Sequence, residues 1–493
     1  MRSSDNGIDI FRIQPRFVIR VPNVLCLKKQ PLGKVMKTKI GFLPLYLKLY
    51  DDCVPEKRAE MKNFLQGVIC EFRRRGIAVA SSDLCRVAEE FKNAVKFFES
   101  EKVDAIVTLH LAYSPSMECI DALAGTEIPL VVLNTTPDFD FGARQKPDKI
   151  MFNHGIHGVQ DMCNMLIRNR KRFLIVAGHW KESDVLDRAC DAIQSAKMAN
   201  SMRNCRVGIF GHPFDGMGDF ALPFSKMKKL IGIKAVSADS GKLRSYLPVV
   251  DSSEVISEIK YLQNHFPCRL DDKILSRSVQ AGLAIRRWIN EEKLDAYTLN
   301  FMCVNKESAL PTVPFIETCM AMSRGIGFAG EGDVLTAALS GAVAKTFPQS
   351  TFVEMFCPDW KNNSIFMSHM GEVNSSLIDD PCITEYEFPY TDAENPAKLS
   401  GRLKPGNAIV LNLAPSIEDK FNFIIAPVEV KKINEDKMEG CIRAWIKPQR
   451  KLSDFLEQFS RAGGTHHSVM AYSKNVKIFT DFAELMGWNN MTI

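Results

Sequence analysis

The chain of 493 residues has 46% hydrophobic and 25% charged residues, an ordinary globular composition that excludes the disordered and fibrous classes. Its net charge of +5 is small and no basic stripe is interleaved with aromatic residues, so we expect no nucleic-acid partner. No window approaches the roughly 18 uninterrupted apolar residues of a membrane helix, so we expect no membrane partner.

The first 35 residues differ in character from the rest of the chain. They are basic, contain prolines and lack the apolar core and cleavage site of a signal peptide. We predict that residues 1–35 are an extension outside the fold and that folding begins at Met36; an organellar transit peptide is the alternative. The fourteen scattered cysteines include no CxxC motif, which indicates reduced thiols and predicts a cytoplasmic protein.

Strand-like and helical patterns alternate over the first part of the chain. Apolar runs at residues 40–46, 76–82, 104–110 and 128–134 are separated by stretches with helical spacing of apolar residues, the first opening at Pro55. Strict alternation of this kind predicts a doubly wound parallel sheet. We assign it to an N-terminal α/β domain over residues 36–171.

The alternation restarts at Arg172, with strand-like runs at residues 172–180, 205–211, 233–239 and 294–301. It predicts a second α/β domain over residues 172–325. After Gly332 the pattern changes to longer runs at residues 383–390, 407–415, 421–430 and 441–448, which are typical of an antiparallel sandwich or barrel. We therefore expect a β-rich C-terminal domain over residues 326–493.

Several acidic side chains and histidines lie where chemistry could occur. Glu331 and Asp333 lie in a glycine-rich turn before a helix, where carboxylates could equally cap the helix N-terminus. Glu354 is flanked by large apolar residues, and a carboxylate in such a run needs a partner or a metal ion. His369 lies between two methionines and, taken alone, is more typical of a core histidine.

The sequence GGTHHS places His466 and His467 side by side before a strand-like run. Adjacent residues of a strand point to opposite faces, so at most one of the two should face a given site. Glu331, Glu354, His369 and one of this pair together offer two carboxylates and two imidazoles. That set suits a divalent first-row ion such as Mn²⁺.

Two further regions attract attention. His110 ends a predicted parallel strand, where open α/β sheets bind ligands, although a buried structural histidine is the alternative. The segment IFGHPFDGMGDF, with His212, Asp215 and Asp219, also resembles part of a site, but we assign it no role.

The motifs GFAGEGDVLTAAL, FVEMF, SHMGEV and GGTHHS, in this order, resemble the L-arabinose isomerase family, within the group that includes L-fucose isomerase. Weaker similarity extends upstream to Met36. The resemblance implies two Rossmann-like α/β domains followed by a C-terminal domain that contains an antiparallel β-barrel. It also implies a homo-oligomer, because members of this family are often hexamers.

The resemblance further implies that Glu331, Glu354, His369 and His467 bind Mn²⁺, with Mg²⁺ or Co²⁺ as alternatives. His466 would then point away from the metal or support its neighbour. His110 matches a sugar-site histidine of the family, and Tyr50 also matches its pattern.

The implied activity is aldose–ketose isomerisation of a monosaccharide through a cis-enediol, with Glu331 and Glu354 as the acid/base pair. Leu47 stands where the family has a glutamine that contacts sugar, and an apolar side chain cannot replace that hydrogen bond. L-Fucose, D-arabinose or another deoxy sugar are therefore alternative substrates. A sugar-binding protein without turnover is a further alternative.

Overall fold

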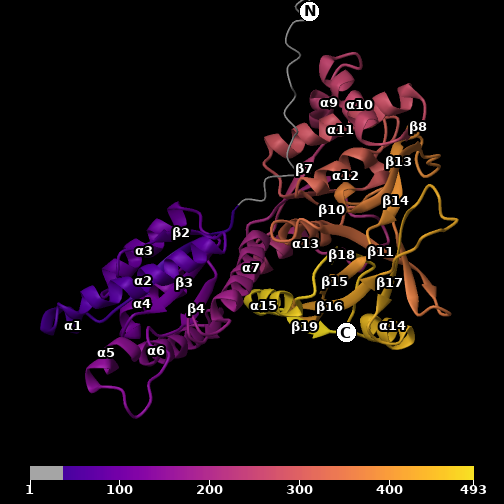
Figure 1. Cartoon of the computed structure of the whole chain (residues 1–493). Coiled ribbons are helices and arrows are strands. Elements are labelled where there is room, and N and C mark those ends of the chain that lie inside the picture. The colour runs from indigo at the N-terminus through magenta and orange to yellow at the C-terminus, as the bar shows by residue number, and fades with distance from the viewer. Residues whose placement is uncertain (1–36) are drawn as a thin grey trace, which may run out of the picture.

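The structure, a computed structural model, describes residues 37–493, so the predicted extension over residues 1–35 lies outside the described residues. The described chain forms three sheets with helices packed around them (Figure 1). Two sheets are parallel, as the alternating sequence pattern predicts. The third is large and mainly antiparallel, and it is built mostly from the C-terminal part of the chain.

The first sheet contains five parallel strands in the order β2-β1-β3-β4-β5. In chain order these are β1 (Lys39–Leu45), β2 (Ala78–Ser81), β3 (Ala105–His110), β4 (Leu130–Asn134) and β5 (Phe173–Ala177). Its helices are α1 (Lys48–Cys53), α2 (Lys57–Arg74), α3 (Ala88–Ser100), α4 (Ser116–Gly125), the 3-10 helix η1 (Pro147–Lys149), α5 (Ile150–Asn153) and α6 (Gly155–Arg168). Strand β3 is buried along its whole length, which explains its continuous apolar run.

The assignment of the run at residues 172–180 to the second α/β unit is wrong. Strand β5 pairs with β4 in parallel, from Leu130 opposite Phe173 to Asn134 opposite Ala177. It therefore completes the first sheet, and the long helix α7 (Val185–Arg203) leads to the second sheet. Local sequence shows that a segment is a strand but does not show which strand it pairs with.

The second sheet has four parallel strands in the order β10-β9-β6-β7. They are β6 (Arg206–Phe210), β7 (Lys234–Ala238), β9 (Ala296–Leu299) and β10 (Gly327–Ala329). Its helices are α8 (Phe224–Leu230), α9 (Ser240–Tyr246), α10 (Ser253–His265), α11 (Asp272–Glu291), the 3-10 helix η2 (Phe301–Cys303), α12 (Phe315–Ser323) and α13 (Val334–Ala344). Strand β10 falls in the predicted C-terminal domain but pairs with β9, so the glycine-rich turn leaves directly from this sheet.

The third sheet has ten strands in the order β19-β16-β15-β18-β11-β12-β17-β14-β13-β8, and β16 also pairs with β17. They are β8 (Cys268–Arg269), β11 (Ser350–Asp359), β12 (Ser364–Ser368), β13 (Ile378–Glu385), β14 (Ala397–Leu403), β15 (Gly406–Pro415), β16 (Phe421–Val430), β17 (Ile442–Pro448), β18 (His467–Ala471) and β19 (Asn489–Thr492). The 3-10 helices η3 (Ser375–Leu377) and η4 (Ile417–Asp419) and the helices α14 (Leu452–Arg461) and α15 (Val476–Met486) complete this region. The prediction of a β-rich C-terminal region is confirmed.

Helix α7 lies against the first sheet on one side and against helices α13 and α15 on the other. It runs between the first sheet and the rest of the molecule and packs along α15 and α13 (Figure 1).

The cysteines from Cys53 to Cys441 are free. Within residues 37–493 no helix is both long and apolar enough to cross a membrane. Strands β5 and β10 each pair with a strand on the other side of a predicted limit, so sheet membership does not change at residues 171 and 325. The division into domains itself stays a prediction.

Candidate functional site

Four segments of the chain meet at one cluster of carboxylates and imidazoles. The turn between β10 and α13 carries Glu331, strand β11 carries Glu354, His369 follows β12, and His467 begins β18. Strand pairing places them together, because Glu354 lies opposite His467 on one side and opposite Ser368 on the other. The sheet register therefore brings together Glu354, His369 and His467, and the turn supplies Glu331, the fourth predicted metal ligand.

Glu331 has a strained backbone. Its φ of 62° is in the left-handed region, which a residue with a side chain occupies at a cost of about 1–3 kcal/mol. Tertiary contacts hold it there: the N–H of Phe214 donates to its carbonyl oxygen at 2.9 Å, and Asp333 N–H donates to Gly330 O at 3.0 Å. Backbone strain held by surrounding structure is typical of functional sites.

Gly332, with φ of 80°, is required next to this turn. A Cβ atom there would meet His212 O at 2.6 Å and Pro213 Cα at 2.7 Å, both main-chain atoms that cannot move aside easily. We expect Gly332→Ala to lower the free energy of unfolding by about 2 kcal/mol or more, measured by thermal or urea unfolding. Gly76 is the matched control, because its φ of 82° is equally left-handed but nothing lies within 4 Å of the added Cβ. Equal losses in Gly76→Ala and Gly332→Ala would contradict this account.

Carboxylates fix the orientation of both buried imidazoles. His467 Nδ1–H donates to Asp333 Oδ2 at 3.0 Å, and His369 Nδ1–H donates to Glu372 Oε2 at 2.5 Å. Because carboxylates only accept, Nδ1 carries the proton on each ring and Nε2 is left for the site. His467 Nε2 lies 3.4 Å from Glu331 Oε2, and His369 Nε2 lies 3.6 Å from Glu354 Oε2. Both Nε2 atoms therefore face the carboxylates.

The donor atoms are close enough to share an ion. Glu354, His369 and His467 each offer an atom within 4.8 Å of the others, and so do Glu331, His466 and His467. His467 belongs to both groups, is fully buried, and its Nε2 makes no hydrogen bond in the described structure. A buried, unpartnered imidazole nitrogen between two carboxylates fits a divalent cation.

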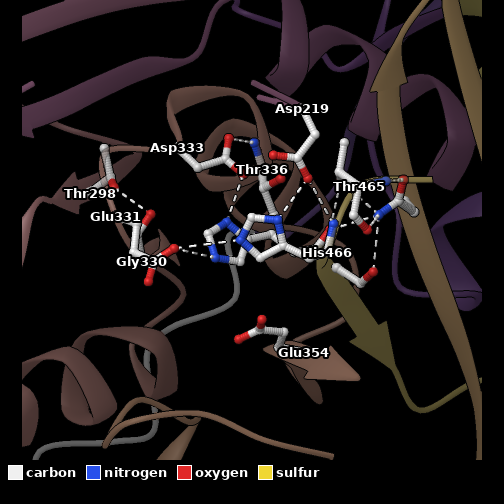
Figure 2. A network of polar contacts seen from close by, with 12 residues as sticks. Asp219, Thr298, Gly330, Glu331, Asp333, Thr336, Glu354, Thr465 and His466 are labelled. Carbon is white, nitrogen blue, oxygen red and sulfur yellow. Dashed lines mark hydrogen bonds and ion pairs between the residues drawn. The ribbon is translucent and has the colours of Figure 1, made fainter. Parts of the chain in front are cut away.

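The expectation that His466 points away from the cluster is wrong. His466 precedes β18, so the alternation of faces within a strand does not apply to it. Its Nε2 lies 3.5 Å from Glu331 Oε2, the same oxygen that His467 approaches (Figure 2). The alternative expectation, that His466 supports its neighbour His467, stays a prediction; the centroids of the two rings lie 4.1 Å apart.

The two glutamates have different electrostatic surroundings. Burial would raise the pKa of Glu331, but its contacts with His466 and His467 hold the pKa of that carboxyl well below its usual range. Burial raises the pKa of Glu354, and the nearby His369 only partly opposes this effect. Burial would lower the pKa of His467, but Asp333 and Glu331 outweigh it and raise that pKa to about 10. Two carboxyls with separated pKa values are typical of acid–base pairs.

Asp333 both caps a helix and belongs to the site, two roles that were expected to be alternatives. Its Oδ1 accepts a hydrogen bond from Thr336 N–H at 2.8 Å, which caps α13, and its Oδ2 holds His467. Figure 2 shows Asp333 and Glu354 on opposite sides of the central imidazole rings. The capping interpretation is therefore confirmed for Asp333, whereas Glu331 makes no cap contact with this helix.

Sequence reasoning missed two supporting residues. Glu372 lies three residues after His369, within the SHMGEV motif, and this close spacing was the available signal. Asn412, on β15, donates to the carbonyl oxygens of Thr465 at 2.9 Å and His467 at 2.7 Å, and its Oδ1 accepts from Thr465 N–H at 3.1 Å. It therefore fixes the main chain on both sides of His466, and no local signal in the sequence marks it.

The structure does not bring His110 and Tyr50 to this cluster within one chain. His110 ends β3 as predicted, and it is buried against α6. Both of its ring nitrogens are unpartnered among the described residues. Burial lowers its pKa to about 3. The Tyr50 hydroxyl contacts His154 Nε2 at 2.9 Å. His110 ends a strand of the first sheet and Tyr50 lies in the neighbouring helix α1, and Figure 1 shows both elements apart from β11, β18 and α13.

Comparison with known proteins adds independent information about these segments. A model of the L-arabinose isomerase central domain matches residues 229–347, and a model of the L-arabinose isomerase C-terminal domain matches residues 349–489. The first match contains Glu331, and the second contains Glu354, His369 and His467. The whole candidate cluster therefore falls within the matched segments.

Full-length relatives show the same similarity. An L-arabinose isomerase from Bacillus subtilis (strain 168) is 25% identical over 412 residues, which cover 80% of this chain and 82% of the relative. An L-arabinose isomerase from Oceanobacillus iheyensis is 26% identical over 443 residues, which cover 84% and 90%. Among solved structures, a periplasmic solute-binding protein from Actinobacillus succinogenes 130z covers 63% of this chain and 92% of its own at 13% identity, but its TM-score of 0.17 is too low to support an argument.

Proposed function

Since this chain belongs to the L-arabinose isomerase family, we propose that it is a sugar isomerase that binds a divalent metal ion through Glu331, Glu354, His369 and His467. One observation carries the proposal: two imidazoles, each fixed by a carboxylate at Nδ1, direct Nε2 toward the two glutamates. Such carboxylate–histidine pairs are typical of metal sites. The mixed oxygen and nitrogen donors favour Mn²⁺, with Mg²⁺ and Co²⁺ as alternatives.

A bound divalent ion polarises the sugar oxygens beside it and stabilises negative charge as it develops on them. The protein's own contribution is proton transfer. One of Glu331 and Glu354 removes the proton from C2 of the aldose and returns it to C1, through a cis-enediol, while the other moves the hydroxyl proton. The separated pKa values of these two carboxyls support this division of work without assigning the roles.

L-Arabinose is the first candidate substrate because the matched relatives are named L-arabinose isomerases. Leu47 is half-buried at the start of α1 and offers no hydrogen bond from its side chain. L-Fucose, D-arabinose and further deoxy sugars are therefore alternative substrates that should be tested beside L-arabinose. The proposal also includes a cytoplasmic location. It further includes a closed β-barrel, because β16 pairs with β17 as well as with β15.

A panel of aldopentoses and 6-deoxyhexoses tests the proposal, with ketose formation measured on metal-stripped protein before and after addition of Mn²⁺. Manganese-dependent turnover of one sugar is the expected result, and it would identify the substrate. Tight Mn²⁺ binding without turnover of any sugar would contradict the isomerase and favour a sugar-binding role.

We also propose that the protein is a homo-oligomer in which the first sheet of one copy faces the metal cluster of another. The carboxyl ends of β1, β3 and β4 lie at one edge of the first sheet, since these strands are parallel. Large apolar side chains that follow these strand ends are exposed, namely Leu49 (57%), Met117 (71%), Phe139 (69%) and Phe141 (48%). An apolar edge beside Tyr50 and His110 is typical of a surface that another protein covers.

Complementation between inactive variants tests this arrangement. We expect a Tyr50→Ala/His110→Gln variant and a Glu354→Gln variant to lose activity separately and to regain part of it when the two are co-expressed. Recovery follows because an intact first sheet from one copy would meet an intact cluster from the other. Co-expression of Glu331→Gln with Glu354→Gln is the control and should give no recovery. The same failure with the first pair would contradict a site shared between copies.

A further inference from the structure

The segment from Gly211 to Leu222, which follows β6, packs against the histidine pair. The ring of Phe220, only 2% exposed, stacks on His467 with ring centroids 5.3 Å apart and planes 13° apart. Two residues of this segment, Phe214 and Asp219, also make hydrogen bonds to the cluster. A loop of the second parallel sheet therefore forms one side of the site that the third sheet carries.

Asp219 makes the most specific of these contacts. A single carboxylate oxygen, Oδ2, accepts two hydrogen bonds from His466, one from the main-chain N–H at 3.0 Å and one from ring Nδ1–H at 2.7 Å (Figure 2). The first fixes the main chain just before β18, and the second fixes the rotation of the ring. Since Nδ1 donates to Asp219, Nε2 is the nitrogen that faces Glu331, at 3.5 Å.

The His466 ring packs against Phe220 and His467 but is only partly covered. Its side chain is 32% exposed, whereas the side chains of His369 and His467 are 2% and 0% exposed. An imidazole with a third of its surface in solvent can turn away unless a hydrogen bond holds it. Asp219 provides the ring hydrogen bond that holds His466 next to the Glu331 carboxylate.

We propose that Asp219 is a positioning residue of the isomerase site. Acting through His466, it keeps the Glu331 carboxylate directed toward the cation and the sugar. This inference rests on the proposed function, because it gives Asp219 a part in that same site. Partners of this kind outside the ligand set typically affect metal affinity or activity by about 10–100-fold when they are removed.

The test compares Asp219→Ala, Asp219→Asn and Asp215→Ala with the unmodified full-length protein. Free Mn²⁺ is followed by electron paramagnetic resonance to obtain Kd, and kcat and KM are measured separately. We expect Asp219→Ala to weaken Mn²⁺ binding or lower kcat by about 10–100-fold, with little change in KM. Asp219→Asn should recover most of this loss, because an amide oxygen can accept the same two hydrogen bonds. Asp215, whose side chain is 93% exposed in the same loop, is the matched control and should behave as the unmodified protein.

Each outcome decides between the two proposals. If the unmodified protein binds Mn²⁺ and Asp219→Ala has the same Kd and kcat, the positioning role is overturned and the proposed function stays intact. An equal loss in Asp219→Asn and Asp219→Ala would also overturn it, since the acceptor oxygen would then not be the cause. Failure of the unmodified protein to bind Mn²⁺ would overturn the proposed function, and the positioning role with it.

Discussion

Replacing Glu354 with glutamine is expected to reduce kcat by about 10²–10⁴-fold, the usual contribution of a positioned general acid or base. Glutamine keeps the shape of the side chain and one oxygen near His369, but it cannot accept and release a proton. Glu354 is the carboxylate whose pKa burial raises, so its proton equilibrium is the feature that the substitution removes. The measurement is kcat with saturating Mn²⁺, so that any weaker metal binding is compensated.

Glu429→Gln is the matched control for this substitution. Glu429 is an exposed residue of β16 in the same sheet, and its replacement should leave kcat unchanged. Undiminished turnover in Glu354→Gln, with Mn²⁺ saturating, would remove Glu354 from the proton-transfer assignment. It would leave open its part in holding the cation.

Replacing His467 with glutamine is expected to weaken Mn²⁺ binding by more than the roughly 10–100-fold typical of residues outside the ligand set. His467 is the one residue shared by both groups of potential ligand atoms, and Asp333 already fixes its orientation. Binding to the folded state stabilises it, by about 2.7 kcal/mol when free Mn²⁺ is 100 times Kd. The unmodified protein should therefore gain thermal stability on Mn²⁺ addition, and His467→Gln should lose this gain.

His265→Gln provides the control for this experiment. His265 is an exposed residue at the end of α10, and its replacement should preserve the stabilisation by Mn²⁺. A His467→Gln variant stabilised by Mn²⁺ as strongly as the unmodified protein would show that the cation binds elsewhere.

Much of this architecture could be predicted from local pattern. The alternation of apolar runs and helical spacing predicts parallel sheets because each strand is buried on both faces, as β3 is. The unusual position of Glu354 in an apolar run also pointed correctly to a partner, since His369 lies 3.6 Å away. The family resemblance carried by four motifs implied the set Glu331, Glu354, His369 and His467, and the structure places these side chains close together.

The remaining features depend on contacts between distant segments. Strand β5 appeared to open the second α/β unit, but pairing with β4 decides its sheet. His466 could not be placed by the alternation of a strand, because the strand begins only at His467. Asp219 lies 247 residues before His466 in the chain, so no periodicity or spacing connects the two.

The most direct test of the central claim is the rate of ketose formation by metal-stripped protein during titration with Mn²⁺, using the sugar that the panel identifies. The account predicts no turnover without metal and a rate that rises in proportion to bound Mn²⁺, saturating at one ion for each chain. Turnover that is undiminished after complete metal removal, or absent from fully loaded protein for every sugar of the panel, would contradict it.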